Sequence, residues 1–439
     1  MLREKLCKFS LVNFAKGGRA MKRLLAVLVV LFVVMMSTVS WAENVKEVKI
    51  GSIYPMSGSL AKIGATTKNA IDMAVEIINN KSDVPMKYAA TEGLPNLGGA
   101  KIKVIWADHQ AKPELGMAEA ERLITSEKVH ALFGCYNSSV TATASQAAER
   151  RKIPFVNGES ASPTLTERGF KWFFRTTPTD DFFSKMFFEF LKNIEKEKGY
   201  KVETIANVYE NTLWGTDSGK FIAKHAKNYG YKVVLDMPYT HRTADLTAEV
   251  QKLKSVNPDV VFMSSYTSDA ILYTKTFKEL DFNPKAVIAQ DSGYLAPEFV
   301  TTVKEDCNFT MSREVFAADL GVKKPIIKTI SDLYYKKYGE FLDGTTARAL
   351  QGFLVLVDAI NRAGSVKPAA IQKALIETDL GPNDIFMPWK GVKFDPKTHQ
   401  NTKIFGIIVQ YQNMTPVTVW PFDLASADLV WPLPAWKDR

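Results

Sequence analysis

Histidine and the common catalytic motifs are scarce in this chain of 439 residues, which holds five histidines. It contains no GxSxG or HExxH pattern, and no glycine-rich phosphate loop follows a predicted strand. One histidine, His109, is a candidate general base because it stands beside Asp108 after a predicted strand. We interpret it as a solvated or capping histidine. The sequence therefore predicts no catalytic residues, no cofactor and no enzyme.

Cysteine is equally scarce, with three residues that form neither a CxxC pair nor a Cys/His metal spacing. We therefore expect no metal site. Cys7 belongs to the N-terminal segment, while Cys135 and Cys307 are far apart in sequence. The sequence leaves two alternatives for this pair, a single disulfide or two buried thiols.

Long hydrophobic runs are also missing, apart from Leu24–Met36. That run is shorter than the roughly 20 residues that span a bilayer, follows Lys22 and Arg23, and precedes a small-x-small site ending at Ala42. This pattern predicts a signal peptide cleaved near Ala42, with Met21 as the true start of translation. No cysteine at the cleavage site offers a lipid anchor, so we expect a periplasmic protein.

The positive charge of the chain lies largely in this leader. Residues 1–42 carry seven Lys or Arg and one acid, so the formal net charge of +9 falls by six to +3 for the remainder. Lys and Arg form no larger cluster there. The sequence therefore predicts no binding to nucleic acid or to an anionic membrane.

The remaining length of about 400 residues exceeds what one hydrophobic core usually spans. Short β-branched runs alternate with helical periods, and this alternation starts again after residue 175, which predicts two doubly wound parallel-sheet lobes of the α/β class. Late elements are expected to return to both lobes and to form a multi-strand hinge. The expected division is a leader 1–42, a first lobe 43–175 plus 313–388, a second lobe 176–312 plus 389–425, and a Trp/Pro-rich tail 426–439 that packs across the lobes.

Polar residues follow the predicted strands, at the edge where open α/β sheets bind ligands. In the first lobe, Ser138 and Ser139 open a helix whose free N–H groups suit a carboxylate, and Ser160, Ala161 and Ser162 follow the next strand. An ordinary serine cap and turn explain each loop equally well.

In the second lobe the corresponding positions hold Trp214, Tyr266 and Asp291. An acid opposite hydroxyl-rich loops favours a zwitterion, with Asp291 pairing an ammonium and the serines holding a carboxylate. The alternative for Asp291 is an ordinary turn residue after a strand.

Several short motifs, in order, resemble the type I periplasmic binding proteins of branched-chain amino acid and amide ABC transporters. The resemblance rests on residues 49–58, Trp106 to Asp108, Gly134 to Ser139, Ser160 to Thr166, and Trp214-Gly215. It implies a soluble, monomeric solute-binding subunit that works with separate permease and ATPase subunits. By matching position, it implies ligand contacts from Ser138, Ser160, Ala161, Ser162, Trp214, Tyr266 and Asp291.

The sequence departs from the leucine-binding members of that family at three positions. Ile63 stands where they place a tryptophan over the ligand side chain, Asn137 replaces a disulfide cysteine, and Glu159 is an extra residue in the serine loop. We therefore expect a small amino acid-like ligand of unassigned side chain. An amide, urea or small carboxylate, including an aromatic acid, is the alternative within the family, and a sensor ectodomain or a hydrolase is the alternative outside it.

Overall fold

Five short strands between residues 47 and 175 form a parallel sheet in the computed structural model, which describes residues 45–439. The strands are β1 (Glu47–Tyr54), β2 (Lys101–Asp108), β3 (Ala131–Gly134), β4 (Phe155–Asn157) and β5 (Phe173–Arg175), in the order β2-β1-β3-β4-β5. The predicted leader, its cleavage at Ala42 and the start at Met21 lie outside the described residues. No helix within residues 45–439 combines the length and apolar character needed to cross a bilayer.

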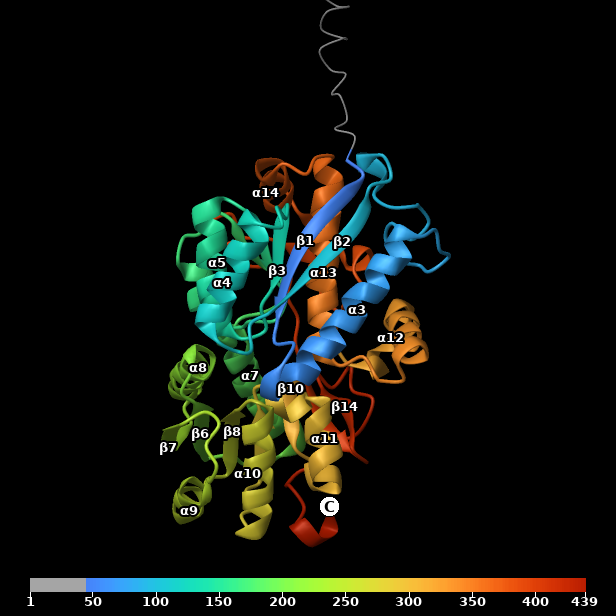
Figure 1. The fold of residues 1–439 in the computed structure, drawn as a ribbon. Coiled ribbons are helices and arrows are strands. Elements are labelled where there is room, and N and C mark those ends of the chain that lie inside the picture. Colours follow the sequence, from blue (N-terminus) through green and yellow to red (C-terminus); the bar gives the residue numbers. More distant parts are fainter. Residues whose placement is uncertain (1–44) are drawn as a thin grey trace, which may run out of the picture. The chain divides into compact units, whose positions relative to one another are not determined.

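Alternate residues of β1 enter two different hydrophobic clusters, because successive side chains of a strand point to opposite faces. Val48 and Ile50 pack with α3 (Ala61–Asn79) and α13 (Gly344–Ala363), whereas Ile53 packs with α4 (Pro113–Thr125) and α5 (Ser138–Arg151). Figure 1 shows these two helix pairs on either side of the strands. This lobe also holds α6 (Thr164–Glu167), α12 (Pro325–Tyr338) and α14 (Pro368–Ile376).

The second sheet has seven strands in the order β14-β13-β10-β9-β8-β6-β7. These are β6 (Thr204–Glu210), β7 (Lys232–Tyr239), β8 (Val260–Ser264), β9 (Ala286–Ala289), β10 (Met311–Glu314), β13 (Ile407–Gln412) and β14 (Thr415–Trp420). Helices α7 (Asp180–Lys198) and α8 (Leu213–Tyr229) cover one face, and α9 (Thr247–Val256), α10 (Thr267–Glu279) and α11 (Pro297–Val303) cover the other. The expected doubly wound α/β class is thus confirmed in both lobes.

The last two strands of this sheet run antiparallel to their neighbours, which the expectation of parallel sheets did not include. They form a hairpin whose two loop residues, Asn413 and Met414, both have positive φ, of 51° and 59°. Such a two-residue turn matches the twist of paired strands.

The chain crosses between the two sheets three times within the described residues: after β5, after β10 and before β13. The first and third crossings are hydrogen-bonded to each other, since Arg175 N–H donates to the carbonyl of His399 and Asn401 N–H donates to that of Arg175, at 3.0 and 2.9 Å. A small sheet of β11 (Asp379–Leu380) and β12 (Val392–Lys393) precedes the third crossing. Crossings of this kind form a hinge. The lobe boundaries expected from the sequence stay a prediction.

The Trp/Pro-rich tail packs on the second lobe. Trp431 stacks on Tyr200 with ring centroids 5.8 Å apart, and the indole N–H of Trp436 donates to the carbonyl of Phe282 at 3.1 Å. These two contacts lie on the second lobe, and Ser426 at the start of the tail donates to Asp319, which follows the second crossing. Packing of the tail across both lobes stays a prediction.

The two cysteines in the described residues are unpaired and buried in different hydrophobic clusters. Cys135 follows β3 in the first lobe and Cys307 precedes β10 in the second. Burial raises the pKa of both thiols, that of Cys307 to about 12. Both therefore stay protonated and unreactive at neutral pH.

We predict that the mature protein offers no thiol to Ellman's reagent while folded and two after denaturation in guanidinium. Dithiothreitol should leave its melting temperature unchanged, because no disulfide constrains the unfolded chain. If the denatured protein shows no free thiol, Cys135 and Cys307 form a disulfide.

Candidate functional site

A small cavity lies where the strand ends of the two sheets face each other. Its volume is about 20 Å³, room for little more than a water molecule. Its lining comes from both lobes and consists of Tyr136, Ser138, Glu159, Ser160, Ala161, Trp214, Tyr266, Asp291, Ser292, Arg313 and Arg348. Six of the eight residues that the sequence singled out are therefore brought together: Ser138, Ser160, Ala161, Trp214, Tyr266 and Asp291.

Ser139 and Ser162 do not line the cavity. Ser139 is the second residue of α5, one position past the residue that faces inward, and it is partly exposed. The hydroxyl of Ser162 donates instead to the carboxylate of Asp217 on α8, and that of Thr164 does so at 2.9 Å. Ser162 thus holds one lobe to the other at the edge of the cavity.

The two lining serines differ in what their hydroxyls already contact. Ser160 is engaged inside the first lobe, at 2.8 Å from the carbonyl oxygen of Cys135 and 2.7 Å from the hydroxyl of Thr141. Ser138 accepts one long hydrogen bond, from the N–H of Ser162 at 3.4 Å, and donates to no group in the described residues. Its proton is free for a partner, and it opens α5, whose first N–H groups favour an anion.

An aromatic wall closes the opposite side of the cavity. The rings of Trp214 and Tyr266 lie 4.9 Å apart, and that of Tyr136 lies 6.0 Å from Tyr266. The hydroxyls of Tyr136 and Ser292 are 2.8 Å apart and join the two lobes. All three rings are almost wholly buried.

Asp291 is already paired in the structure. Its Oδ2 accepts from Arg313 on β10 at 2.9 Å and from Arg348 on α13, so the second contact joins the lobes. All three side chains are at most 2% exposed. Asp291 has φ 61°, a costly backbone for a residue other than glycine, and its N–H donates to Ser312 at 3.0 Å.

The pairing of Asp291 leaves two charged atoms unused. Oδ1 of Asp291 and Nη1 of Arg348 are buried without a hydrogen-bond partner among residues 45–439, as is Oε2 of Glu159. Buried ionic atoms normally find partners, because each unmade bond carries a desolvation cost. The cavity lining therefore has one cationic donor and two carboxyl oxygens ready for a ligand.

Glu159 is a buried acid whose other oxygen accepts from the hydroxyl of Tyr54 at 2.7 Å. Burial raises its pKa to about 8, although the bond from Tyr54 and the charge of Arg348 oppose the rise. At neutral pH it is mostly neutral, so two guanidinium groups outweigh one carboxylate and the lining favours an anionic group.

Sequence reasoning missed five of the eleven lining residues, Arg313, Arg348, Tyr136, Ser292 and Glu159, the last of which it noted only as an extra residue in the serine loop. Arg348 did carry a signal, because it is the charged residue in the mainly apolar run Ala347 to Leu356. Arg313 had none, since β10 itself was not predicted.

The sequence predicts a solvated or capping histidine at position 109, but His109 is fully buried. Its Nδ1 accepts the N–H of Ala111 at 2.9 Å, so the expected capping role fits the geometry. Burial lowers its pKa to about 4, which keeps the ring neutral. In residues 45–439 no group of three or more His, Cys, Asp or Glu could hold a metal ion.

The family model described as periplasmic binding protein matches residues 47–412. This chain belongs to that family. Leu/Ile/Val-binding protein homolog 7 of Brucella abortus is 30% identical over 390 residues, which cover 87% of this chain and 94% of the relative. The expected family is thereby confirmed, and with it a binding protein rather than an enzyme.

Solved structures share the fold of this periplasmic binding protein. The leucine-binding protein LivK of Thermotoga maritima has a TM-score of 0.73 at 22% identity, covering 86% of this chain and 99% of that one. A solute-binding protein of an ABC transporter from Rhodopseudomonas palustris, in complex with 3,4-dihydroxybenzoic acid, has a TM-score of 0.71 at 19% identity, covering 90% and 100%. At such identities the likeness establishes the fold alone.

We predict that Glu159 makes this periplasmic binding protein less stable as the pH rises from about 4.5 to 8. The folded state holds the proton up to about pH 8, whereas the unfolded chain releases it near 4.5, so the stabilising contribution is full below 4.5 and is lost across that window. Glu159→Gln keeps the oxygen that accepts from Tyr54 and does not titrate. Its melting temperature should equal the wild-type value at pH 5 and exceed it at pH 8. The difference in free energy of unfolding at pH 8 should be on the order of 3 kcal/mol.

Thermal unfolding of both proteins from pH 5 to 8 measures this difference. Glu314 and Asp180, whose pKa values burial raises to about 8 and about 7, titrate in both proteins and cancel. A difference that is constant with pH would show that Glu159 is not protonated at neutral pH.

Proposed function

We propose that this protein is the extracytoplasmic solute-binding subunit of an ABC importer and that it holds an amino acid-like ligand between its lobes. The ligand carboxylate binds the first lobe, at Ser138 and Arg348, and the ammonium binds Asp291 on the second. The protein delivers the ligand to a permease that works with ATPase subunits. It acts as a monomer in the periplasm. The Brucella relatives carry the name Leu/Ile/Val-binding, which supports this class of ligand.

One observation carries the proposal: unpartnered charges of both signs surround a single cavity. Nη1 of Arg348 lacks an acceptor, and Oδ1 of Asp291 lacks a donor. A carboxylate and an ammonium on one small molecule satisfy both atoms at once, whereas a simple anion or cation leaves one of them buried and unpaired.

The role of Asp291 differs from that of a free acid awaiting an ammonium. Two arginines share its Oδ2, so the acid also orients Arg348 toward the ligand carboxylate. The ammonium then uses Oδ1, and the ligand binds next to an existing ion cluster.

Ligand entry requires the lobes to separate, because a cavity of about 20 Å³ cannot admit an amino acid. The contacts that must open include those of Tyr136 with Ser292, Ser162 and Thr164 with Asp217, and Arg348 with Asp291. The three crossings supply the hinge for this motion.

An aromatic acid is the second candidate, favoured by the wall of Tyr136, Trp214 and Tyr266 and by the excess of guanidinium groups. A neighbour from Rhodopseudomonas palustris was solved with 4-hydroxybenzoate. In this case the carboxylate binds Arg348 and Ser138, the ring stacks on the aromatic wall, and Asp291 serves only to position the arginine.

We predict that a thermal-shift screen returns an α-amino acid as the strongest stabiliser. A ligand at 100 times its Kd adds about 2.7 kcal/mol of stability. The des-amino acid and the amino acid amide of that hit should each bind far more weakly, because each lacks one of the two charges. An aromatic acid as strongest hit, with no response to amino acids, would replace the first candidate by the second.

We predict further that Asp291→Asn weakens binding of the amino acid hit by about 30-fold or more, mainly through the off-rate, because a buried ammonium loses its charged partner. Calorimetry and stopped-flow measurements give the affinity and the rate. Asp319→Asn, the same change at a residue that bonds Thr418 outside the cavity, is the control and should bind as wild type does. Equal affinity of Asp291→Asn and wild type would mean that Asp291 contacts no ammonium.

A further inference from the structure

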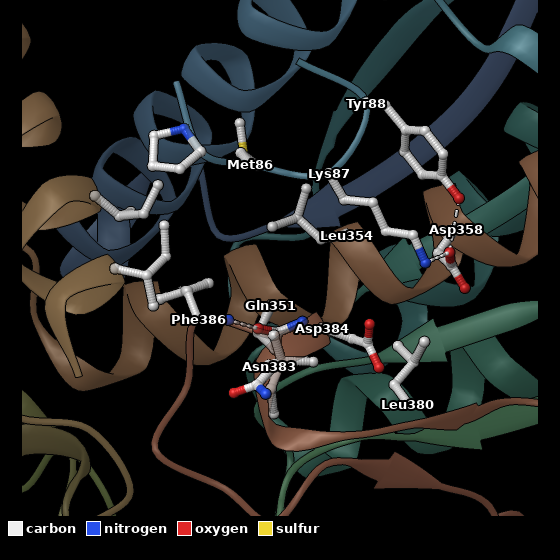
Figure 2. Close-up of a pocket in the computed structure, with 14 residues that line it drawn as sticks. Met86, Lys87, Tyr88, Gln351, Leu354, Asp358, Leu380, Asn383, Asp384 and Phe386 are labelled. Atoms are coloured by element: carbon white, nitrogen blue, oxygen red, sulfur yellow. Dashed lines mark hydrogen bonds and ion pairs between the residues drawn. The ribbon is translucent and has the colours of Figure 1, made fainter. Parts of the chain in front are cut away.

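A second and larger cavity lies within the first lobe, beside α12 and α13, and measures about 260 Å³. It shares no lining residue with the cavity between the lobes. Figure 2 shows side chains from the loop around residue 86, from α13 and from the segment around residue 384 converging on it.

The walls of this second cavity are mainly apolar. Ile326 and Ile330 of α12 face it together with Leu354 of α13, and Met86 and Phe386 complete the wall. An apolar cavity of about 150 Å³ already binds a molecule the size of benzene. This one therefore has room for an aromatic or branched aliphatic body with one further polar group.

The polar group of such a ligand has a defined partner in Gln351. Its side chain is 2% exposed, and its Oε1 accepts the N–H groups of Phe386 at 3.0 Å and Met387 at 3.4 Å. No group in residues 45–439 accepts a hydrogen bond from its amide nitrogen. This nitrogen is not among the sealed, unpartnered atoms of the described residues, so it is open to the cavity, where water or a ligand carbonyl accepts from its N–H groups.

The charged side chains that line the cavity offer no free cation to a ligand. They are Lys87, Asp358 and Asp384. The carboxylate of Asp358 accepts from Lys87, from Tyr88 at 2.7 Å and from Arg362 at 2.7 Å. Burial opposes a low pKa for Asp358, but these bonds lower it, so the acid stays ionised. Lys87 is thus already paired, and the lining has no surplus of positive charge to hold a carboxylate.

From these observations we propose that the first lobe has a second binding site, for a small neutral ligand that combines an apolar body with a carbonyl oxygen. The body occupies the wall of Ile326, Ile330 and Leu354, and the carbonyl accepts from the amide of Gln351. Primary and secondary amides have this chemistry. The site is independent of the ligand proposed between the lobes.

The probe for this site is 4-fluorobenzamide, followed by fluorine NMR with the mature protein. Its signal should broaden and shift saturably on wild type. Gln351→Glu keeps the oxygen that accepts from Phe386 but removes the N–H donor. The probe should therefore bind at least about tenfold more weakly. Charged 4-fluorobenzoate should bind more weakly than the amide, because a carboxylate loses hydration and gains no net positive charge.

Two variants locate the probe. Met86→Trp fills the cavity from a partly exposed loop, and Asn383→Trp fills it from the exposed rim, so each should abolish binding while the circular dichroism melt stays that of a folded protein. Trp214→Ala alters only the cavity between the lobes and should leave probe binding unchanged.

Three results would overturn the second site. These are no saturable signal on wild type at millimolar probe, unchanged affinity in folded Met86→Trp or Asn383→Trp, and loss of binding in Trp214→Ala. The last would assign the probe to the cavity between the lobes.

Discussion

The arrangement of the two lobes depends on one buried carboxylate that two arginines share. Asp291 accepts from Arg313 of its own lobe and from Arg348 of the other, with all three side chains almost fully excluded from solvent. Three charges out of water are tolerable only when they pair closely. The contact between Asp291 and Arg348 joins the lobes and still leaves Oδ1 of Asp291 and Nη1 of Arg348 without a partner in the described residues. In the proposed complex the ligand binds these two atoms beside the intact pair.

Helix α13 connects this cluster to the rest of the first lobe. Arg348 faces the cavity between the lobes, and Gln351, one turn along, faces the second cavity. The two spaces differ in kind: the first is very small and lined by ionic and aromatic groups, and the second is larger and mainly apolar. The two proposed ligands differ accordingly, because an ionic group needs the charges of the first and an apolar body needs the walls of the second.

Much of the fold follows from local patterns. The strands β8 and β9 and the helix α12 carry clear local signals, because β8 and β9 are short apolar runs and α12 begins at a proline, a residue that favours the first turn of a helix. Strand β10 was missed, since Met311-Ser-Arg-Glu has one apolar residue and reads as polar sequence. It is buried because Arg313 donates to Gln290 and Asp291, which lie 23 and 22 positions away in the sequence, and no local pattern records such contacts.

The sequence by itself determined the α/β class, the restart that makes two lobes, and the strand-end loops that meet in a cavity, because these depend on residue periods and on the rule that parallel strands end at one edge. Only the tertiary structure decided which hydroxyl stays free, that Ser162 bonds Asp217 rather than facing the cavity, and that Asp291 is already held by Arg313 and Arg348. Those outcomes are contacts between residues 22 to 57 positions apart. Only the packing of the lobes brings such residues within hydrogen-bond distance.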